Sequence, residues 1–187
     1  ERIKAIDTFL EKFPEYRKNF VFIMAGVPSR VRIVAYQKLN EEIDNLVEKI
    51  NWKYQSGRYK PVIYLKEYVS HSTLLTLNRM ANFCIVSSLH DGMNLVAKEF
   101  VSSRTDEQGV LILSPFTGAA RELTDALLVN PYATDHFAKA IKIALEMPRE
   151  EQKRRMRKMR AVVMENNVYK WASDIIYELV KFEFGKS

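Results

Sequence analysis

Residues 83–101 read FCIVSSLHDGMNLVAKEFV. Four apolar residues of strand-forming types come first, a polar segment containing Gly92 follows, and residues 95–101 then have the apolar spacing of a helix. A short apolar strand, a loop and an amphipathic helix form the repeating unit of α/β proteins with a parallel sheet. This stretch therefore predicts how the rest of the chain is built.

The same unit recurs on both sides of this stretch. Further strands are predicted at residues 20–25, 61–65, 110–113 and 126–129. Further helices are predicted at residues 3–13, 39–54, 74–80, 118–123, 136–147, 149–163 and 171–180. The alternation predicts a doubly wound, Rossmann-like parallel sheet with helices on both faces and a helical C-terminal tail. We expect a single domain over residues 1–187, and one further strand supplied by a segment upstream of the first helix.

The composition excludes several classes of protein. The 187 residues are 47% apolar and 28% charged, which is typical of a globular domain with a full core. The longest apolar run covers residues 20–27, far fewer than the ~20 residues of a membrane span, so no membrane partner is expected. The single cysteine, Cys84, excludes an internal disulfide and a cysteine-rich zinc site, and it favours a reducing, cytoplasmic location.

The net charge of +6 comes from one short run. Its six basic residues are Lys153, Arg154, Arg155, Arg157, Lys158 and Arg160. Met156, Met159 and Val163 lie among them at helical spacing, so the run is interpreted as the wet face of an amphipathic helix. That interpretation is favoured over a nucleic-acid or anionic-membrane patch, and no nucleic-acid partner is predicted. Trp52 and Trp171 are interpreted as packing residues rather than a platform for a sugar.

The carboxyl ends of the strands are where a ligand should lie. In doubly wound sheets, ligands bind beyond these ends, which here are followed by residues 27–32, 67–72, 87–94 and 114–118. In the third loop, Gly92 allows a backbone to approach a ligand closely. The helix that follows presents free N–H groups and the positive end of its dipole, which suits a phosphate or diphosphate. Small residues in the fourth loop indicate close packing.

Two acidic residues flank this predicted phosphate site. Asp91 precedes the helix and Glu99 lies on it eight residues later. A carboxylate can accept two hydrogen bonds from a sugar diol, so one acid could hold a hexose and the other a ribose. The alternative, which the residues alone leave equally open, is that Asp91 caps the helix and Glu99 is a surface acid. Arg30, at the end of the first strand, suits a phosphate, although the residues alone favour a surface arginine.

At these residues the chain resembles a known family. The segment Asp91-Gly92-Met93-Asn94-Leu95-Val96-Ala97-Lys98-Glu99 is similar to the donor-binding motif of α,α-trehalose-phosphate synthases (UDP-forming), which are retaining two-domain (GT-B) glycosyltransferases. Three other stretches agree in order and spacing: residues 27–30 with Tyr36 and Gln37, residues 109–114, and residues 118–120 running on to 128–131. The likeness covers nearly the whole chain, whereas other retaining two-domain glycosyltransferases share only a looser acidic-pair pattern.

The resemblance implies a fold, an activity and partners. The chain would be most of the C-terminal, donor-binding domain of a GT-B enzyme. Such an enzyme moves glucose from UDP-glucose to glucose 6-phosphate with retention, giving trehalose 6-phosphate and UDP, and needs no metal or other cofactor. The acceptor-binding N-terminal domain would be the partner in the same polypeptide, so the fragment alone is not expected to catalyse transfer. A second copy of the chain and a trehalose phosphatase are the other partners to consider.

The resemblance also implies roles for individual residues. Asp91 would be the catalytic residue that contacts the glucose hydroxyls, and Val69 would lie beside the uracil. The stretch against the donor sugar, diphosphate and nucleotide would be Gly92, Met93, Asn94, Leu95, Val96, Ala97, Lys98 and Glu99, with Glu99 on the ribose. Arg30 would reach the phosphate of glucose 6-phosphate.

Two departures from the family pattern keep alternatives open. The pair Val31-Arg32 stands where the family usually has Gly-Asp or a similar acidic pair, and Pro115 replaces a usual acid. A related retaining glycosyltransferase with another acceptor is therefore one alternative. A non-catalytic regulatory subunit that keeps the fold is another, although the intact motif acids argue against it.

Overall fold

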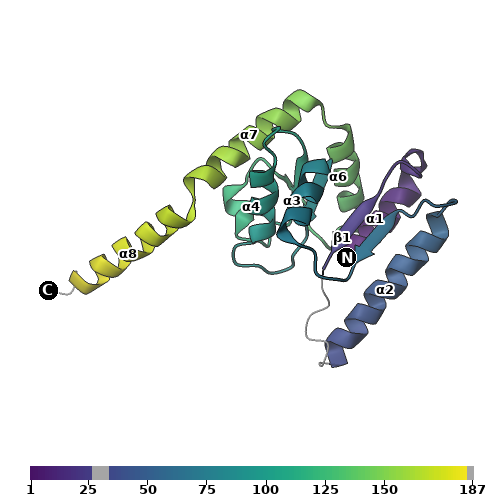
Figure 1. Ribbon diagram of the computed structural model, residues 1–187, viewed down its shortest axis with the longest axis horizontal. Coiled ribbons are helices and arrows are strands. Elements are labelled where there is room, and N and C mark those ends of the chain that lie inside the picture. Colours follow the sequence, from purple (N-terminus) through teal and green to yellow (C-terminus); the bar gives the residue numbers. More distant parts are fainter. Residues whose placement is uncertain (27–33, 185–187) are drawn as a thin grey trace.

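The five predicted strands are all present in the computed structural model, which describes residues 1–26 and 34–184 (Figure 1). They are β1 Phe22–Ala25, β2 Val62–Leu65, β3 Phe83–Val86, β4 Val110–Leu113 and β5 Leu127–Leu128. β3 and β4 have the predicted bounds, and the other three are one or two residues shorter. Every pairing between these strands is parallel, so the predicted α/β class is confirmed.

Helices alternate with the strands as predicted. They are α1 Arg2–Lys12, α2 Val34–Tyr54, α3 His71–Met80, α4 Leu95–Ser103, α5 Ala119–Glu122, α6 Thr134–Glu146, α7 Arg149–Glu165 and α8 Val168–Phe184. A short 3-10 helix, Pro14–Tyr16, follows α1, because Pro14 lacks the N–H that would continue the α-helix. α2 begins five residues before its predicted start, since its first residues are mostly exposed and add no apolar periodicity.

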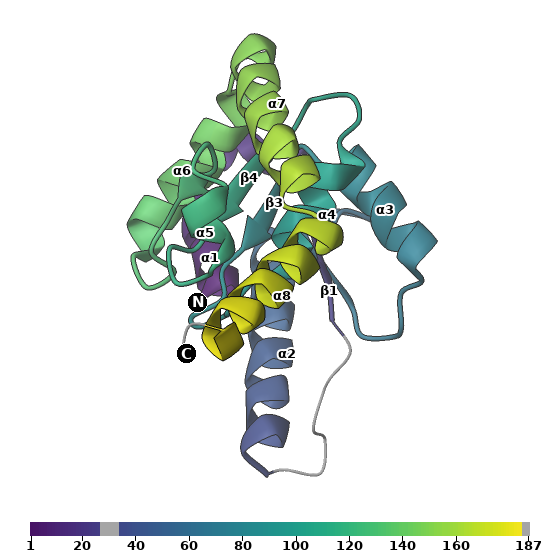
Figure 2. The same ribbon diagram turned by 90° about the vertical axis from the view of Figure 1, so that its left-hand side faces the viewer.

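Helices cover β3 and β4 on two sides, and each side has its own core. Figure 2 shows β3 and β4 between α1 and α6 on one side and α3 and α4 on the other. Along β4 the side chains alternate: Val110 and Ile112 pack in the core with α1 and α6, whereas Leu111 and Leu113 pack in the core with α4 and α7. All four are buried, and burying each side chain of this size contributes about 1.5–3 kcal/mol.

The sheet is divided into two pieces in the described residues. β1 pairs with β2, and β3, β4 and β5 form a separate three-stranded sheet. The two pieces nevertheless share a core that contains Phe22 of β1 and Ile85 of β3, and the rings of Phe20 and Phe83 lie 6.2 Å apart. One edge of β1 pairs with β2, and one edge of β3 pairs with β4. Among the described residues, the other edge of β1 and the other edge of β3 have no strand partner.

The outer face of the β1–β2 pair is not covered within the described residues. Ile23 and Ile63, paired in register, are 42% and 41% exposed. The apolar strands led us to expect helices on both faces of the sheet. Among the described residues, helices cover both faces of β4 but not both faces of β1. Trp52 and Trp171, interpreted above as packing residues, are 81% and 56% exposed, so that interpretation is wrong for the described part of the chain.

The two last helices differ in how they are packed. α7 carries the basic run and packs on α4 through the buried Met156 and Met159, as its amphipathic pattern predicted. Its arginines form ion pairs: Arg157 Nη2 lies 2.8 Å from Glu107 Oε2, and Arg155 Nε lies 2.7 Å from Glu151 Oε1. α8 instead extends away from the sheets as an arm (Figure 1), and none of residues 168–182 is buried. No helix within the described ranges is long and apolar enough to cross a bilayer.

Candidate functional site

The turn formed by residues 91–94, hereafter the motif turn, is the second half of the loop between β3 and α4. The Asp91 carboxylate is held from two sides: Oδ1 accepts the Met93 backbone N–H at 3.2 Å, and Oδ2 accepts from Asn94 Nδ2 at 3.0 Å. These bonds fix the position of the carboxylate. Each carboxylate oxygen can accept more than one hydrogen bond, so Asp91 retains acceptor capacity for a ligand.

Asn94, and not Asp91, is the N-cap of α4. Its Oδ1 accepts the Ala97 backbone N–H at 2.9 Å, and its φ of 67° lies in the left-handed region, which asparagine tolerates better than most residues. The reading of Asp91 as the helix cap, left open above, is therefore excluded. The sequence carried a signal for this, because Asn94 immediately precedes the first apolar residue of the helix.

The first turn of α4 offers unpaired donors. Leu95 and Val96 are exposed, and within the described ranges neither backbone N–H has a hydrogen-bond partner. Such groups point out of the N-terminal end of a helix, where the helix dipole also favours negative charge. This geometry matches the phosphate-binding arrangement predicted from the sequence.

A second loop, residues 114–118, supports the motif turn from beneath; we call it the support loop. The Gly118 N–H donates to Asp91 O at 3.0 Å, the Ala119 N–H donates to Met93 O at 2.9 Å, and Asp91 pairs with Thr117 in a parallel bridge. Ser114 and Thr117 are themselves buried. The close-packing role expected for this loop is confirmed, and its contact with the motif turn is the feature that the sequence analysis missed.

The other side chains of the nine-residue motif are either packed and paired within the protein or exposed to solvent. Ala97 is fully buried in the core beside α7. Lys98 Nζ lies 3.0 Å from both carboxylate oxygens of Glu122, which also accepts from Asn166 Nδ2, and the lysine side chain is 17% exposed. Glu99 is exposed, and within the described ranges its carboxylate has no hydrogen-bond or ion-pair partner.

The other predicted site residues come from separate loops. Val69 is half-buried in the loop after β2, next to Ser70, which caps α3 by accepting the Thr73 N–H. Arg30 and the Val31-Arg32 pair lie outside the described residues.

Among the described residues, neither Cys84 nor a cluster of metal-ligating side chains forms a second reactive or metal-binding site. Cys84 lies in β3 and is half-buried, and desolvation raises the pKa of its thiol to about 12, so the thiol is protonated at neutral pH. Over residues 1–26 and 34–184, no three His, Cys, Asp or Glu side chains come together as metal ligands.

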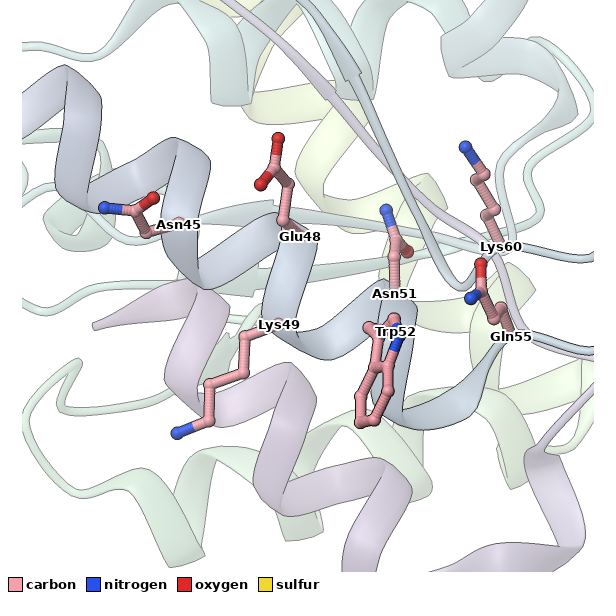
Figure 3. A pocket seen from close by; sticks show the side chains of 7 residues that line it. All are labelled: Asn45, Glu48, Lys49, Asn51, Trp52, Gln55 and Lys60. Atoms are coloured by element: carbon pink, nitrogen blue, oxygen red, sulfur yellow. The ribbon is translucent and has the colours of Figure 1, made fainter.

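Two surface hollows lie away from the motif turn. One of about 520 Å³ is on the outer side of α2, where Glu48 and Lys49 point away from each other and Trp52 lies on the surface (Figure 3). Its Asn51 is already bonded to the backbone of Val62 through both side-chain atoms. Because its polar groups diverge, this hollow has no arrangement for a ligand. The other, about 550 Å³, lies along α8.

The family model described as glycosyltransferase family 20 matches residues 1–181. A bifunctional trehalose-6-phosphate synthase/phosphatase of Thermoproteus tenax is 40% identical over 96% of this chain and 24% of its own length. A trehalose-6-phosphate synthase of Sodalis glossinidius is 40% identical over 97% of this chain and 39% of its own length. The chain thus spans about two fifths or less of the relatives that it matches.

Solved structures also match nearly the whole of this chain and about two fifths of their own. A structure from E. coli bound with UDP-2-fluoro glucose has a TM-score of 0.93 and 36% identity, over 95% of this chain and 40% of that one. A trehalose-phosphate synthase (UDP-forming) from Burkholderia xenovorans in complex with glucose-6-phosphate has a TM-score of 0.93 and 37% identity, with the same coverages. Since both alignments include nearly all of this chain, the likeness extends over the sheets and the helices together.

Proposed function

The chain belongs to glycosyltransferase family 20, and on that premise we propose that it is the donor-binding part of an α,α-trehalose-phosphate synthase (UDP-forming). The full-length enzyme would transfer glucose from UDP-glucose to glucose 6-phosphate with retention, in trehalose biosynthesis. The observation that carries the proposal is the motif turn. It holds the Asp91 carboxylate beside the open Gly92 backbone and the unpaired N–H groups that begin α4.

The donor would occupy the space above the motif turn. Asp91 would accept hydrogen bonds from the glucose hydroxyls, and its fixed position supports that role. The backbone of Gly92, Met93 and Asn94 would lie against the sugar and diphosphate, and the N–H groups of Leu95 and Val96 would face the phosphates. Glu99, exposed and without a partner among the described residues, would accept the ribose hydroxyls.

Ala97, Lys98 and Val69 would contribute to the donor site in other ways. Ala97 is buried and Lys98 is paired with Glu122, so these two residues would act by shaping α4 while their backbone lies near the donor. Val69 would lie by the uracil, a role supported by its place beyond the carboxyl end of β2.

Transfer with retention and without a protein nucleophile suggests attack from the face that UDP leaves, through an oxocarbenium-like state. Catalysis would then consist of positioning the two substrates and stabilising negative charge on the departing UDP. The N-terminus of α4 can supply part of that stabilisation without a metal, because its dipole and free N–H groups are oriented before the reaction begins.

The acceptor site is proposed to lie between this domain and an N-terminal domain of the same polypeptide. Arg30 would bind the phosphate of glucose 6-phosphate. Two features of the described residues support the further domain: the apolar surface of α8 and the edges of β1 and β3 that no described strand pairs. We propose that a strand preceding α1 fills the gap between those edges, completing one Rossmann-like sheet.

The remaining partner and location assignments stay proposals. The bifunctional Thermoproteus tenax relative supports a link to a trehalose phosphatase. A second copy of the chain is a further partner to test by measuring the oligomeric state. A cytoplasmic location is proposed because the sequence has a single cysteine, Cys84, and therefore no internal disulfide.

The test is UDP release from UDP-glucose by the full-length protein, with and without glucose 6-phosphate. We expect release that depends on glucose 6-phosphate. UDP binding without release would instead favour a regulatory subunit or another acceptor, and loss of both binding and release would contradict the proposed function.

A further inference from the structure

Gly118 lies where the support loop meets the motif turn, and no side chain fits there. A Cβ on Gly118 would overlap the carbonyl oxygen of Gly92 and would lie 2.9 Å from its carbonyl carbon and 3.4 Å from the Cα of Met93. These are backbone atoms, which cannot rotate away as the end of a flexible side chain can. Because the φ of Gly118 is −60° and its ψ is −34°, any residue could adopt its backbone conformation. The contact, and not the dihedral angle, therefore requires glycine.

The motif turn cannot easily move away from a larger residue at this position. Gly118 and Ala119 donate backbone hydrogen bonds to Asp91 and Met93, one on each side of Gly92. The support loop is equally fixed, since Thr117 Oγ1 donates to Ser114 O at 3.0 Å and both residues are buried. A displacement of Gly92 would therefore also move Asp91.

The space beside the Cα of Gly92 is open. A Cβ on Gly92 itself would meet no atom within 4 Å. The carbonyl group of Gly92 thus lies against Gly118, whereas its side-chain position is available to a ligand. We propose that Gly118 is a positioning residue. It determines how far the Gly92 backbone and the Asp91 carboxylate lie from the donor sugar. This inference rests on the proposed function.

The test is the Gly118→Ala variant of the full-length protein, assayed for kcat, for KM of each substrate and for the Kd of UDP. Displacing reacting groups by roughly 1 Å can cost about 100-fold in rate, so we expect kcat to fall by about that factor. UDP lacks the glucose, so its Kd should change much less, by under about 10-fold. If Gly118 were needed only for folding, the variant would not lose kcat while keeping its affinity for UDP.

The matched control is Gly57→Ala, at a glycine remote from the motif turn with a φ of 59°. Here an alanine is strained, so the unfolding midpoint should fall by about 3 °C while kcat and both KM values stay unchanged. Should Gly118→Ala not fold, Thr117→Val becomes the deciding variant, because it removes the hydroxyl that braces the support loop and keeps the side-chain shape. It should lower kcat by roughly 10-fold, again with little change in the Kd of UDP.

The outcomes separate the two proposals. A wild-type protein that neither binds UDP nor releases it contradicts the proposed function and, with it, this inference. A wild-type protein that is active, together with a folded Gly118→Ala variant of unchanged kcat, overturns the positioning role alone. An unchanged kcat in Thr117→Val has the same meaning if the alanine variant does not fold.

Discussion

Gly92 differs from Gly118 in one respect that an experiment can use. Gly118 faces protein backbone, whereas Gly92 faces open space. Gly92→Ala should therefore leave the unfolding midpoint unchanged to within about 2 °C, since no protein atom is displaced. The added methyl group would instead occupy the place proposed for the donor, so KM for UDP-glucose should rise by at least about 10-fold.

The acceptor serves as the control in that experiment. KM for glucose 6-phosphate should stay within about twofold of wild type, because the proposed acceptor phosphate contact, Arg30, belongs to a different segment of the sequence. An unchanged KM for UDP-glucose in Gly92→Ala would place the donor elsewhere.

At the same scale, the residue types of the motif indicated a phosphate and sugar site but did not assign the contacts within it. Asp91 and Asn94 are both good N-cap residues, and the choice between them depends on backbone geometry. Likewise, the pairing of Lys98 with Glu122 joins residues 24 positions apart, a separation at which the spacing has no periodic signal.

At the scale of single elements, α8 has an apolar surface that no other described part of the chain covers. Trp171, Ile175, Leu179 and Phe182 are all exposed and recur at intervals of three or four residues, so they lie on one face. A continuous apolar stripe of this kind is typical of an interaction surface. We assign it to the proposed N-terminal domain of the same polypeptide.

Leu179→Asp in the full-length protein tests that assignment. Placing a charge in a buried contact should lower the free energy of unfolding by about 2–3 kcal/mol, as measured by denaturant unfolding. Ser173→Asp, on the opposite face of α8, should change it by less than about 0.5 kcal/mol. Equal effects of the two substitutions would show that the stripe is not covered.

At the scale of the whole molecule, the division of the sheet predicts where the proposed additional strand would pair. Phe22 and Gly26 donate to β2, and β3 accepts from β4 at Asn82 and Val86. Because backbone groups alternate in direction along a strand, the N–H groups of the intervening residues point to the unpaired edges. Those residues are Ile23 and Ala25 on β1, and Phe83 and Ile85 on β3.

Amide hydrogen exchange in the full-length protein tests this prediction. If a strand fills the gap, these four amides should exchange at least about 100-fold more slowly than the amide of Tyr64, which points to the outer edge of β2. Exchange at a rate like that of Tyr64 would mean that the gap stays open.

The sequence by itself determined the elements and their order, and it predicted a phosphate and sugar site at the start of α4. Apolar runs, helical spacing and Gly and Pro positions are local signals, and they sufficed for β3, β4 and the start of α4. The nine-residue motif was enough to indicate the family, because its residue types and spacing are both specific.

Only the tertiary structure decided how these pieces meet. Three features depend on segments far apart in the chain: Gly118 supports Gly92, Glu122 pairs with Lys98, and β1 and β3 each have an edge that no described strand pairs. Such contacts have no periodicity, since they are set by how whole elements pack around a common core and by which backbone groups find partners there.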